Sequence, residues 1–141
     1  MSVNVTGYAH VRLTVTDIVR SRRFYDDVFG FPVAVEVPTD ADQVTREKFW
    51  FVFDGVIYQV APGVLLGLRP VAPPGDAFDA DRIGLDHVSF AVPGRDELDA
   101  LAAKLDDLGV PHEPVKDIGA GFILEFRDPD GIALELNAPA S

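Results

Sequence analysis

Two histidines and one glutamate lie in segments of the sequence that are expected to be strands, and their side chains are of types that bind metal ions. His10 and His87 occupy similar alternating segments in the two halves of the chain, and Glu135 lies between two leucines near the carboxyl end. Taken singly, each is more often an ordinary hydrogen-bonded residue of a strand than a ligand. Together, two imidazoles and one carboxylate form a set that suits non-haem Fe(II) and also accepts Mn, Zn, Ni or Co.

Three further side chains are candidates for contacting a substrate or moving a proton. Arg12 shares a strand face with His10 and can meet an anionic group, although an ordinary surface ion pair explains it equally well. His112 is the third and last histidine and is a candidate acid or base, with an exposed rim position as the simpler interpretation. Tyr58 is a candidate for substrate contact and proton donation, as is Tyr8 for proton donation.

The credibility of the metal set comes from an internal repeat rather than from any single residue. Landmarks recur in the same order: GYAHV from Gly7 matches GLDHV from Gly84, FGFP from Phe29 matches LGVP from Leu108, and LGL from Leu66 matches LEL from Leu134. Self-similarity of this kind indicates duplicated structural modules. A duplicated fold brings equivalent histidines towards one central cleft, where a glutamate from the last strand can join them.

The elements that must position these residues follow from periodicity. In the first half, alternation predicts a strand over 8–15, and Asp17 is placed to cap a helix over 18–29 that Gly30 ends. Further strands are expected near 32–38, 48–53, 56–61 and 64–69, with a polar loop over 39–46. In the second half, the expected elements are a strand over 86–92, a helix from Pro93-Gly94 to Gly109, and strands near 112–117, 120–127 and 131–137, the last two joined by a turn at Asp130-Gly131.

A helix with one strand before it and three after it, repeated twice, predicts an α+β fold. We expect two tandem βαβββ modules over 1–70 and 84–141, joined by a proline-rich linker over 71–83. Each module would form a curved mixed sheet with its helix on one side, which leaves the other sheet face to line a central cleft.

Composition and charge exclude several classes of function. The chain has 141 residues, 48% of them apolar and 25% charged, which is typical of a folded globular protein. The net charge of -11 argues against nucleic acid as a partner, and the absence of cysteine excludes disulfides and thiolate chemistry. No membrane-spanning or leader segment is expected, so a cytoplasmic location is the default. The acidic charge indicates either a solvated surface or a field that attracts a cationic ligand.

Four segments resemble the vicinal oxygen chelate superfamily, which includes glyoxalase I, bleomycin-resistance proteins, fosfomycin-resistance enzymes and extradiol dioxygenases. These segments are GYAHVRLTVTD from Gly7, SRRFYDDVFGF from Ser21, DHVSFAV from Asp86 and FRDPDGIALEL from Phe126. In metal-binding members, the ligands come from the first and last strands of each module. The resemblance carries these positions to His10, Gly67, His87 and Glu135.

Three of those four positions hold a possible ligand, and Gly67 does not. Glyoxalase I has a glutamate there that takes part in proton transfer, so the resemblance to that activity is weakened. The remaining set resembles the three-ligand sites of extradiol dioxygenases and of fosfomycin-resistance enzymes. Fosfomycin transfer ranks low, because those enzymes have a threonine where this chain has Arg12 and a longer basic carboxyl end.

The resemblance therefore implies a metal-dependent enzyme, either extradiol-dioxygenase-like or a glyoxalase-like lyase or isomerase. Its cofactor would be Fe2+, Mn2+, Zn2+ or Ni2+, and its substrate a small molecule that chelates the metal through two neighbouring oxygens, with Glu135 and His112 as catalytic candidates. The alternative is a non-catalytic, bleomycin-resistance-like protein that binds a cationic small molecule, which fits the acidic charge. Either class implies a homodimer, with the ligands drawn from one chain or from two.

Overall fold

The computed structural model describes residues 1–141, which form two compact units, Met1–Gly75 and Asp76–Ser141. The boundary lies inside the proline-rich segment over 71–83. We refer to Met1–Gly75 as unit 1 and to Asp76–Ser141 as unit 2, and we describe each by itself. No helix in either unit has the length and apolar character needed to cross a bilayer.

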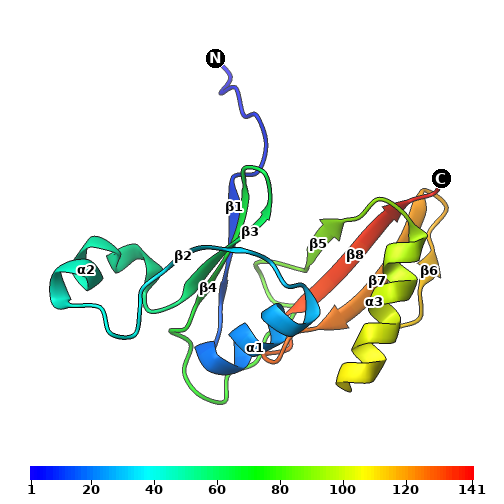
Figure 1. The fold of residues 1–141 in the computed structure, drawn as a ribbon. Coiled ribbons are helices and arrows are strands. Elements are labelled where there is room, and N and C mark those ends of the chain that lie inside the picture. Colours follow the sequence, from blue (N-terminus) through cyan, green and yellow to red (C-terminus); the bar gives the residue numbers. More distant parts are fainter. The chain divides into compact units, whose positions relative to one another are not determined.

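Unit 1 contains one four-stranded mixed sheet with the strand order β1-β4-β3-β2 (Figure 1). Strand β1 pairs in parallel with β4, and the other neighbours are antiparallel. Its elements are β1 (His10–Thr14), α1 (Ile18–Val28), β2 (Val33–Glu36), α2 (Gln43–Lys48), the 3-10 helix η1 (Trp50–Val52), β3 (Val56–Ala61) and β4 (Val64–Arg69).

Alternation along β1 and β4 separates the two faces of this sheet. Leu13, Leu66 and Leu68 are almost fully buried, and α1 lies against β4. Residues on the opposite face of the two strands, His10 and Arg12 among them, are partly or fully exposed apart from Gly67. The polar face that carries His10 is therefore the face away from the apolar core, because side chains along a strand alternate.

The start and end of α1 agree with the sequence prediction. The Asp17 carboxylate accepts hydrogen bonds from the backbone N–H groups of Val19 and Arg20 at 3.0 and 3.1 Å. This bond pattern is the usual N-cap, and it satisfies donors that have no partner inside the helix. Gly30 follows the helix with a φ of 65°, a left-handed conformation that glycine adopts at low cost.

The strand predicted over 48–53 is wrong, because that segment is helical. The Asp42 carboxylate caps α2 by accepting from Thr45 N–H at 2.8 Å, so a helix begins inside the predicted loop. Phe53 and Asp54 then have φ values of 52° and 59°, which no strand residue adopts. The aromatic residues at 50, 51 and 53 thus belong to a turn of 3-10 helix and its end, not to a strand.

Unit 2 repeats the arrangement with the strand order β5-β8-β7-β6 (Figure 1). The pair β5 and β8 is parallel, and the other pairs are antiparallel, as in unit 1. Its elements are β5 (Val88–Ala91), α3 (Arg95–Leu108), β6 (Lys116–Asp117), β7 (Gly121–Arg127) and β8 (Ala133–Pro139). The predicted α+β fold with two equivalent modules is confirmed.

Helix α3 packs against β7 and β8 through Leu98, Leu101 and Leu105, which are buried as their helical spacing predicts. Strand β6 is shorter than expected: only Lys116 and Asp117 pair with β7, and His112 forms an isolated bridge to Phe126. Pro114 lies between these two pairings, and a residue without an N–H group interrupts a ladder.

The turn predicted at Asp130-Gly131 is present and is organised by a carboxylate. Asp128 is 5% exposed, and its side chain accepts hydrogen bonds from the N–H groups of Asp130 and Ile132, each at 2.9 Å. Gly131 has a φ of 81°, which explains why glycine stands there. This turn fixes the register of β7 on β8, and that register sets Glu135 opposite Glu125.

Candidate functional site

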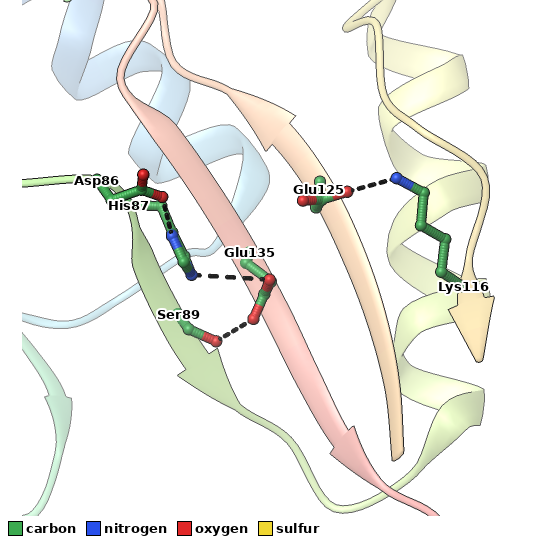
Figure 2. Close-up of polar contacts among 6 residues, drawn as sticks. All are labelled: Asp86, His87, Ser89, Lys116, Glu125 and Glu135. Atoms are coloured by element: carbon green, nitrogen blue, oxygen red, sulfur yellow. Dashed lines mark hydrogen bonds and ion pairs between the residues drawn. The ribbon is translucent and has the colours of Figure 1, made fainter. Parts of the chain in front are cut away.

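His87 and Glu135 face each other in unit 2, as Figure 2 shows. His87 directly precedes β5, and Glu135 stands in the middle of the neighbouring parallel strand β8. Their side chains approach to 3.8 Å between Nε2 of His87 and Oε2 of Glu135. Two of the three predicted metal ligands are therefore adjacent.

Each of these two side chains is held by a neighbour. Nδ1 of His87 is 2.6 Å from Oδ1 of Asp86, and the Ser89 hydroxyl donates to Oε1 of Glu135 at 2.7 Å (Figure 2). When Nδ1 carries the proton, Nε2 is left as the free lone pair that faces Glu135. Hydrogen bonding to Asp86, together with the negative charge of Glu135, raises the pKa of His87.

Glu135 is a nearly buried carboxylate, 9% exposed, and lies between Leu134 and Leu136 in β8. One of its oxygens is satisfied by Ser89, and the other faces His87. A carboxylate in such a place is costly without a cation or hydrogen-bond donors. The donor set therefore fits a divalent ion, since an imidazole nitrogen and a carboxylate oxygen bind such ions at about 2.0–2.2 Å from neighbouring positions.

A cleft of ≈ 550 Å³ opens beside this pair within unit 2. Acidic groups predominate among its lining side chains: they include Asp86, Glu113, Glu125, Asp128 and Glu135, against Lys116 and Arg127. Lys116 neutralises Glu125 through a bond of 2.8 Å, which Figure 2 also shows. The cleft thus keeps excess negative charge close to His87, a field that favours a cation.

His10 lies in unit 1, on β1, with its backbone paired to Leu65. Its side chain is exposed. No group of three or more His, Asp or Glu side chains that could hold a metal ion is formed.

Unit 1 has a different pair at the positions equivalent to Ser89 and Glu135. Ser89 pairs with Glu135 in unit 2, and Arg12 pairs with Gly67 in unit 1. The Arg12 side chain lies over Gly67: a Cβ atom added there would be 3.0 Å from Cγ and 3.5 Å from Nε of Arg12. The space that a carboxylate side chain at position 67 would need is therefore occupied by the Arg12 side chain.

The Arg12 guanidinium rests among aromatic and backbone groups. It donates to the Phe51 carbonyl and lies 5.5 Å from the centre of the Phe53 ring. Arg69 lies over the same ring at 4.5 Å. Burial, and then the positive charge of Arg69, lower the pKa of Arg12. Arg12 is thus a partly desolvated cation beside a second cation.

His112 lines the cleft of unit 2, but both of its ring nitrogens are occupied. Nδ1 is 2.7 Å from the Glu113 carbonyl, and Nε2 is 2.9 Å from the Asp106 carboxylate. These bonds to Glu113 and Asp106 raise the pKa of His112. An imidazole with both nitrogens bonded in this way joins α3 to the β7 edge and has no nitrogen left for a substrate.

Tyr58 is fully buried in the core of unit 1. Its hydroxyl donates to Asp26 at 2.9 Å, and burial followed by this bond raises the pKa of the hydroxyl. Tyr58 therefore offers no surface to a substrate and acts as a core residue. The alternation of side chains along β3 explains this burial, because Tyr58 lies on the same face of the strand as the buried Val56.

Three contacting residues were missed in the sequence: Ser89, Asp86 and Arg69. A signal existed for the first two, since Ser89 follows His87 at the spacing by which Arg12 follows His10, and Asp86 precedes His87 directly. No local signal joins Arg69 and Phe53 to Arg12, because these contacts form between separate elements of the chain.

The fold and the site together define a family. The model of the Glyoxalase/Bleomycin resistance protein/Dioxygenase superfamily matches residues 7–136, and the chain belongs to this superfamily. It is 28% identical over 140 residues to the uncharacterized protein YaeR of Escherichia coli (strain K12), covering 90% of this chain and 92% of that protein.

Solved structures agree with this assignment. A glyoxylase/bleomycin resistance protein/dioxygenase domain from Frankia sp. EAN1pec is 30% identical with a TM-score of 0.76, covering 96% of this chain and 99% of that one. The fosfomycin resistance protein FosX from Listeria monocytogenes, solved with Mn(II) and sulfate, is 20% identical with a TM-score of 0.69, covering 96% and 92%. The likeness to FosX shows the shared fold.

Proposed function

We propose that this chain is a divalent-metal-dependent enzyme whose ligands are His10, His87 and Glu135. The observation that carries the proposal is the approach of His87 Nε2 to Glu135 Oε2 at 3.8 Å. Asp86 orients the imidazole and Ser89 orients the carboxylate, as the partners of ligands do in metal sites. The ion would be Fe2+, Mn2+, Zn2+ or Ni2+, all of which accept two imidazoles and one carboxylate.

The substrate of such an enzyme is a small molecule with two neighbouring oxygens that chelate the ion. When bound, the ion supplies Lewis acidity and a template for the substrate. The protein residues orient the ligands and shape the pocket: Ser89 keeps Oε1 of Glu135 occupied, and the cleft of unit 2 gives the substrate room beside His87. The reaction would be of the extradiol-dioxygenase type or of the lyase and isomerase type, with Glu135 as the candidate side chain for exchanging a proton with the substrate.

The replacement of a fourth ligand by Gly67 supports a site with three protein ligands. Such a set would leave up to three coordination positions free for a chelating substrate and one more small ligand. A Cβ atom at position 67 would meet the Arg12 side chain, so a longer side chain there would have to displace Arg12. The arrangement of unit 1 therefore favours an open site.

Metal analysis tests the proposal. Protein purified without chelator, or reconstituted with Mn2+, is expected to hold the ion in stoichiometric amount, and His87→Ala and Glu135→Ala are expected to lose it. His112→Ala is the matched control, because His112 lies on the same cleft with both nitrogens already bonded. Wild-type protein that takes up none of the four ions would contradict the proposal, as would equal uptake by all variants.

A second candidate function is sequestration of a cationic small molecule, in the manner of bleomycin-resistance proteins. The acidic lining of the unit 2 cleft favours it. The discriminating observation is binding of bleomycin by metal-free protein at an affinity unchanged by His87→Ala.

We also infer that the protein is a homodimer. Light scattering, which measures the mass of the native protein in solution, tests this inference.

A further inference from the structure

Arg12, Arg69 and Phe53 form a group on unit 1 that the proposed metal site does not use. The Phe53 ring lies 4.5 Å from the Arg69 guanidinium carbon and 5.5 Å from that of Arg12. Both arginines stand on the sheet face that carries His10, since Arg12 and His10 alternate together along β1 and Arg69 pairs with Thr14 of the same strand. The group therefore lies on the same sheet face as a proposed metal ligand within one unit.

Neither arginine of this group has a carboxylate partner. The chain has 23 acidic residues against 12 basic ones, and Arg22, Arg46 and Arg95 each form an ion pair. Arg12 and Arg69 form none; Arg12 donates only to a backbone carbonyl, and its Nε is buried without an acceptor. Two adjacent guanidinium groups without carboxylate partners repel each other. A bound anion would reduce this unfavourable electrostatic energy.

The surroundings of the pair are aromatic and accessible. Phe53 is 40% exposed, Phe51 36% and Trp50 68%, and the Trp50 ring packs edge-on against both phenylalanines at 6.1–6.2 Å. Large exposed aromatic side chains that stand together mark a surface for a ligand or partner with a flat apolar part. Because the guanidiniums lie against one of these rings, an anion and an aromatic part would be bound side by side.

We propose that Arg12 and Arg69 bind an oxyanion of the substrate, so that the substrate is an aromatic acid with vicinal oxygens. This inference rests on the proposed function and adds the substrate class to it. Arginine suits the role because its planar fork pairs with both oxygens of a carboxylate or with a phosphonate. Gly67 is the residue that makes it possible, since only a position without a side chain leaves Arg12 its present path.

The same pair disfavours the sequestration of a cationic drug on this face. Two uncompensated positive charges repel a third, and the cost grows where the groups are partly desolvated. The overall charge of -11 is therefore a poor guide to the ligand, because the charge of Arg12 and Arg69 on the sheet face that carries His10 has the opposite sign.

The test compares protocatechuate with catechol, which share the vicinal oxygens and differ in one carboxylate. Each is titrated by calorimetry into metal-free and Mn2+-loaded protein, for the wild type and for Arg12→Met, Arg69→Met and Arg95→Met. Arg95 is the matched control: its guanidinium lies 4.9 Å from the Phe122 ring, but Asp99 neutralises it at 3.7 Å. The single tryptophan, Trp50, gives one indole N–H resonance that reports binding at the group by NMR.

The expected result is a preference for protocatechuate over catechol of roughly 10- to 100-fold, the value of hydrogen bonds to a charged group. The preference should fall to about one in Arg12→Met and Arg69→Met, persist in Arg95→Met, and coincide with a shift of the Trp50 resonance. Competition by benzoate and by phenylphosphonate then distinguishes a carboxylate from a phosphonate as the natural group.

Equal binding of the two probes would overturn the inference, as would a preference that survives in both Arg12→Met and Arg69→Met. A variant that fails to fold is replaced by the other and by Arg12→Lys, which keeps the charge and should keep part of the preference. The comparison of metal-free with Mn2+-loaded protein tests the metal proposal separately. If Mn2+ increases the affinity for neither probe while the preference for the acid remains, the metal proposal fails and the oxyanion site stands.

Discussion

The Ser89 hydroxyl donates to Oε1 of Glu135 at 2.7 Å, across two parallel strands whose backbones pair at these residues. The equivalent strand positions in unit 1 hold Arg12 and Gly67, where the side chain of one covers the bare backbone of the other. The two modules thus share a topology and differ in chemistry. Unit 2 offers a carboxylate where unit 1 offers a guanidinium.

The bond between Ser89 and Glu135 should contribute to stability even without an ion. Ser89→Ala leaves Oε1 of a nearly buried carboxylate without its donor, and we expect unfolding free energy to fall by about 1–2 kcal/mol in urea titrations of metal-free protein. Ser21→Ala is the control, since the Ser21 hydroxyl is buried without a partner and its removal should be neutral or stabilising. A cost at position 21 that equals or exceeds the cost at position 89 would contradict this account of the bond.

Asp86 should matter for the ion more than for the fold. Asp86→Asn weakens the hold on Nδ1 of His87, and loss of such an orienting partner typically reduces metal affinity by about 10- to 100-fold. Calorimetric titration with Mn2+ measures it. Asp107→Asn removes the same charge from an exposed position of α3 and should leave the affinity unchanged. Equal affinities for Asp86→Asn and the wild type would show that Asp86 does not position His87.

Two buried glycines of unit 1 should respond very differently to alanine. At Gly55 a Cβ atom would lie 1.8 Å from the Leu68 carbonyl oxygen, so Gly55→Ala must part the backbones of β3 and β4 and should cost about 3 kcal/mol or more. At Gly67 the obstacle is the Arg12 side chain, which can move, so Gly67→Ala should cost much less. Thermal unfolding of the two variants compares them, and a larger loss for Gly67→Ala would show that Arg12 is fixed.

The bonds of His112 predict a pH dependence of stability. The pKa of His112 is raised by the Glu113 carbonyl and by Asp106, so its folded value exceeds the unfolded value of about 6.5. The contribution is therefore fully present below that unfolded pKa and is lost as pH rises through the folded pKa. Asp106→Asn should destabilise the protein near pH 5.5 and cost little near pH 9, as denaturant titrations at the two pH values would show. A constant cost at both would mean that the ion pair contributes nothing.

The sequence was informative wherever a period or a repeat governed the structure. Alternation and the repeated GxxHV landmark assigned His87 to the first strand of the second module, and the structure places it directly before β5, while helical spacing located Leu98, Leu101 and Leu105 in the core. The segment over 48–53 failed because its aromatic residues suggest a strand while a carboxylate cap and two positive φ values decide otherwise. Those are contacts of single side chains, which composition does not reveal.

The site could be predicted to the extent that its residues lie on strands. Tyr58 was chosen by residue type alone, and the structure places it on the buried face of β3 with Val56. Arg69 and Phe53 could not be joined to Arg12 from the sequence, because β1, β4 and the end of η1 meet only in the folded unit. The positive charge of the surface formed by Arg12, Arg69 and Phe53 could not be predicted for the same reason, because the net charge is a sum over all residues and does not show which of them lie together.

The proposal that His10 joins His87 and Glu135 as a metal ligand is tested most directly by substituting His10. Mn2+ titration by calorimetry should give a stoichiometric site in the wild type and a loss of affinity of at least about 100-fold in His10→Ala, comparable to the loss in His87→Ala. His112→Ala should retain the wild-type affinity. Unchanged Mn2+ affinity in His10→Ala, with loss in His87→Ala alone, would contradict the claim and confine the ion to unit 2.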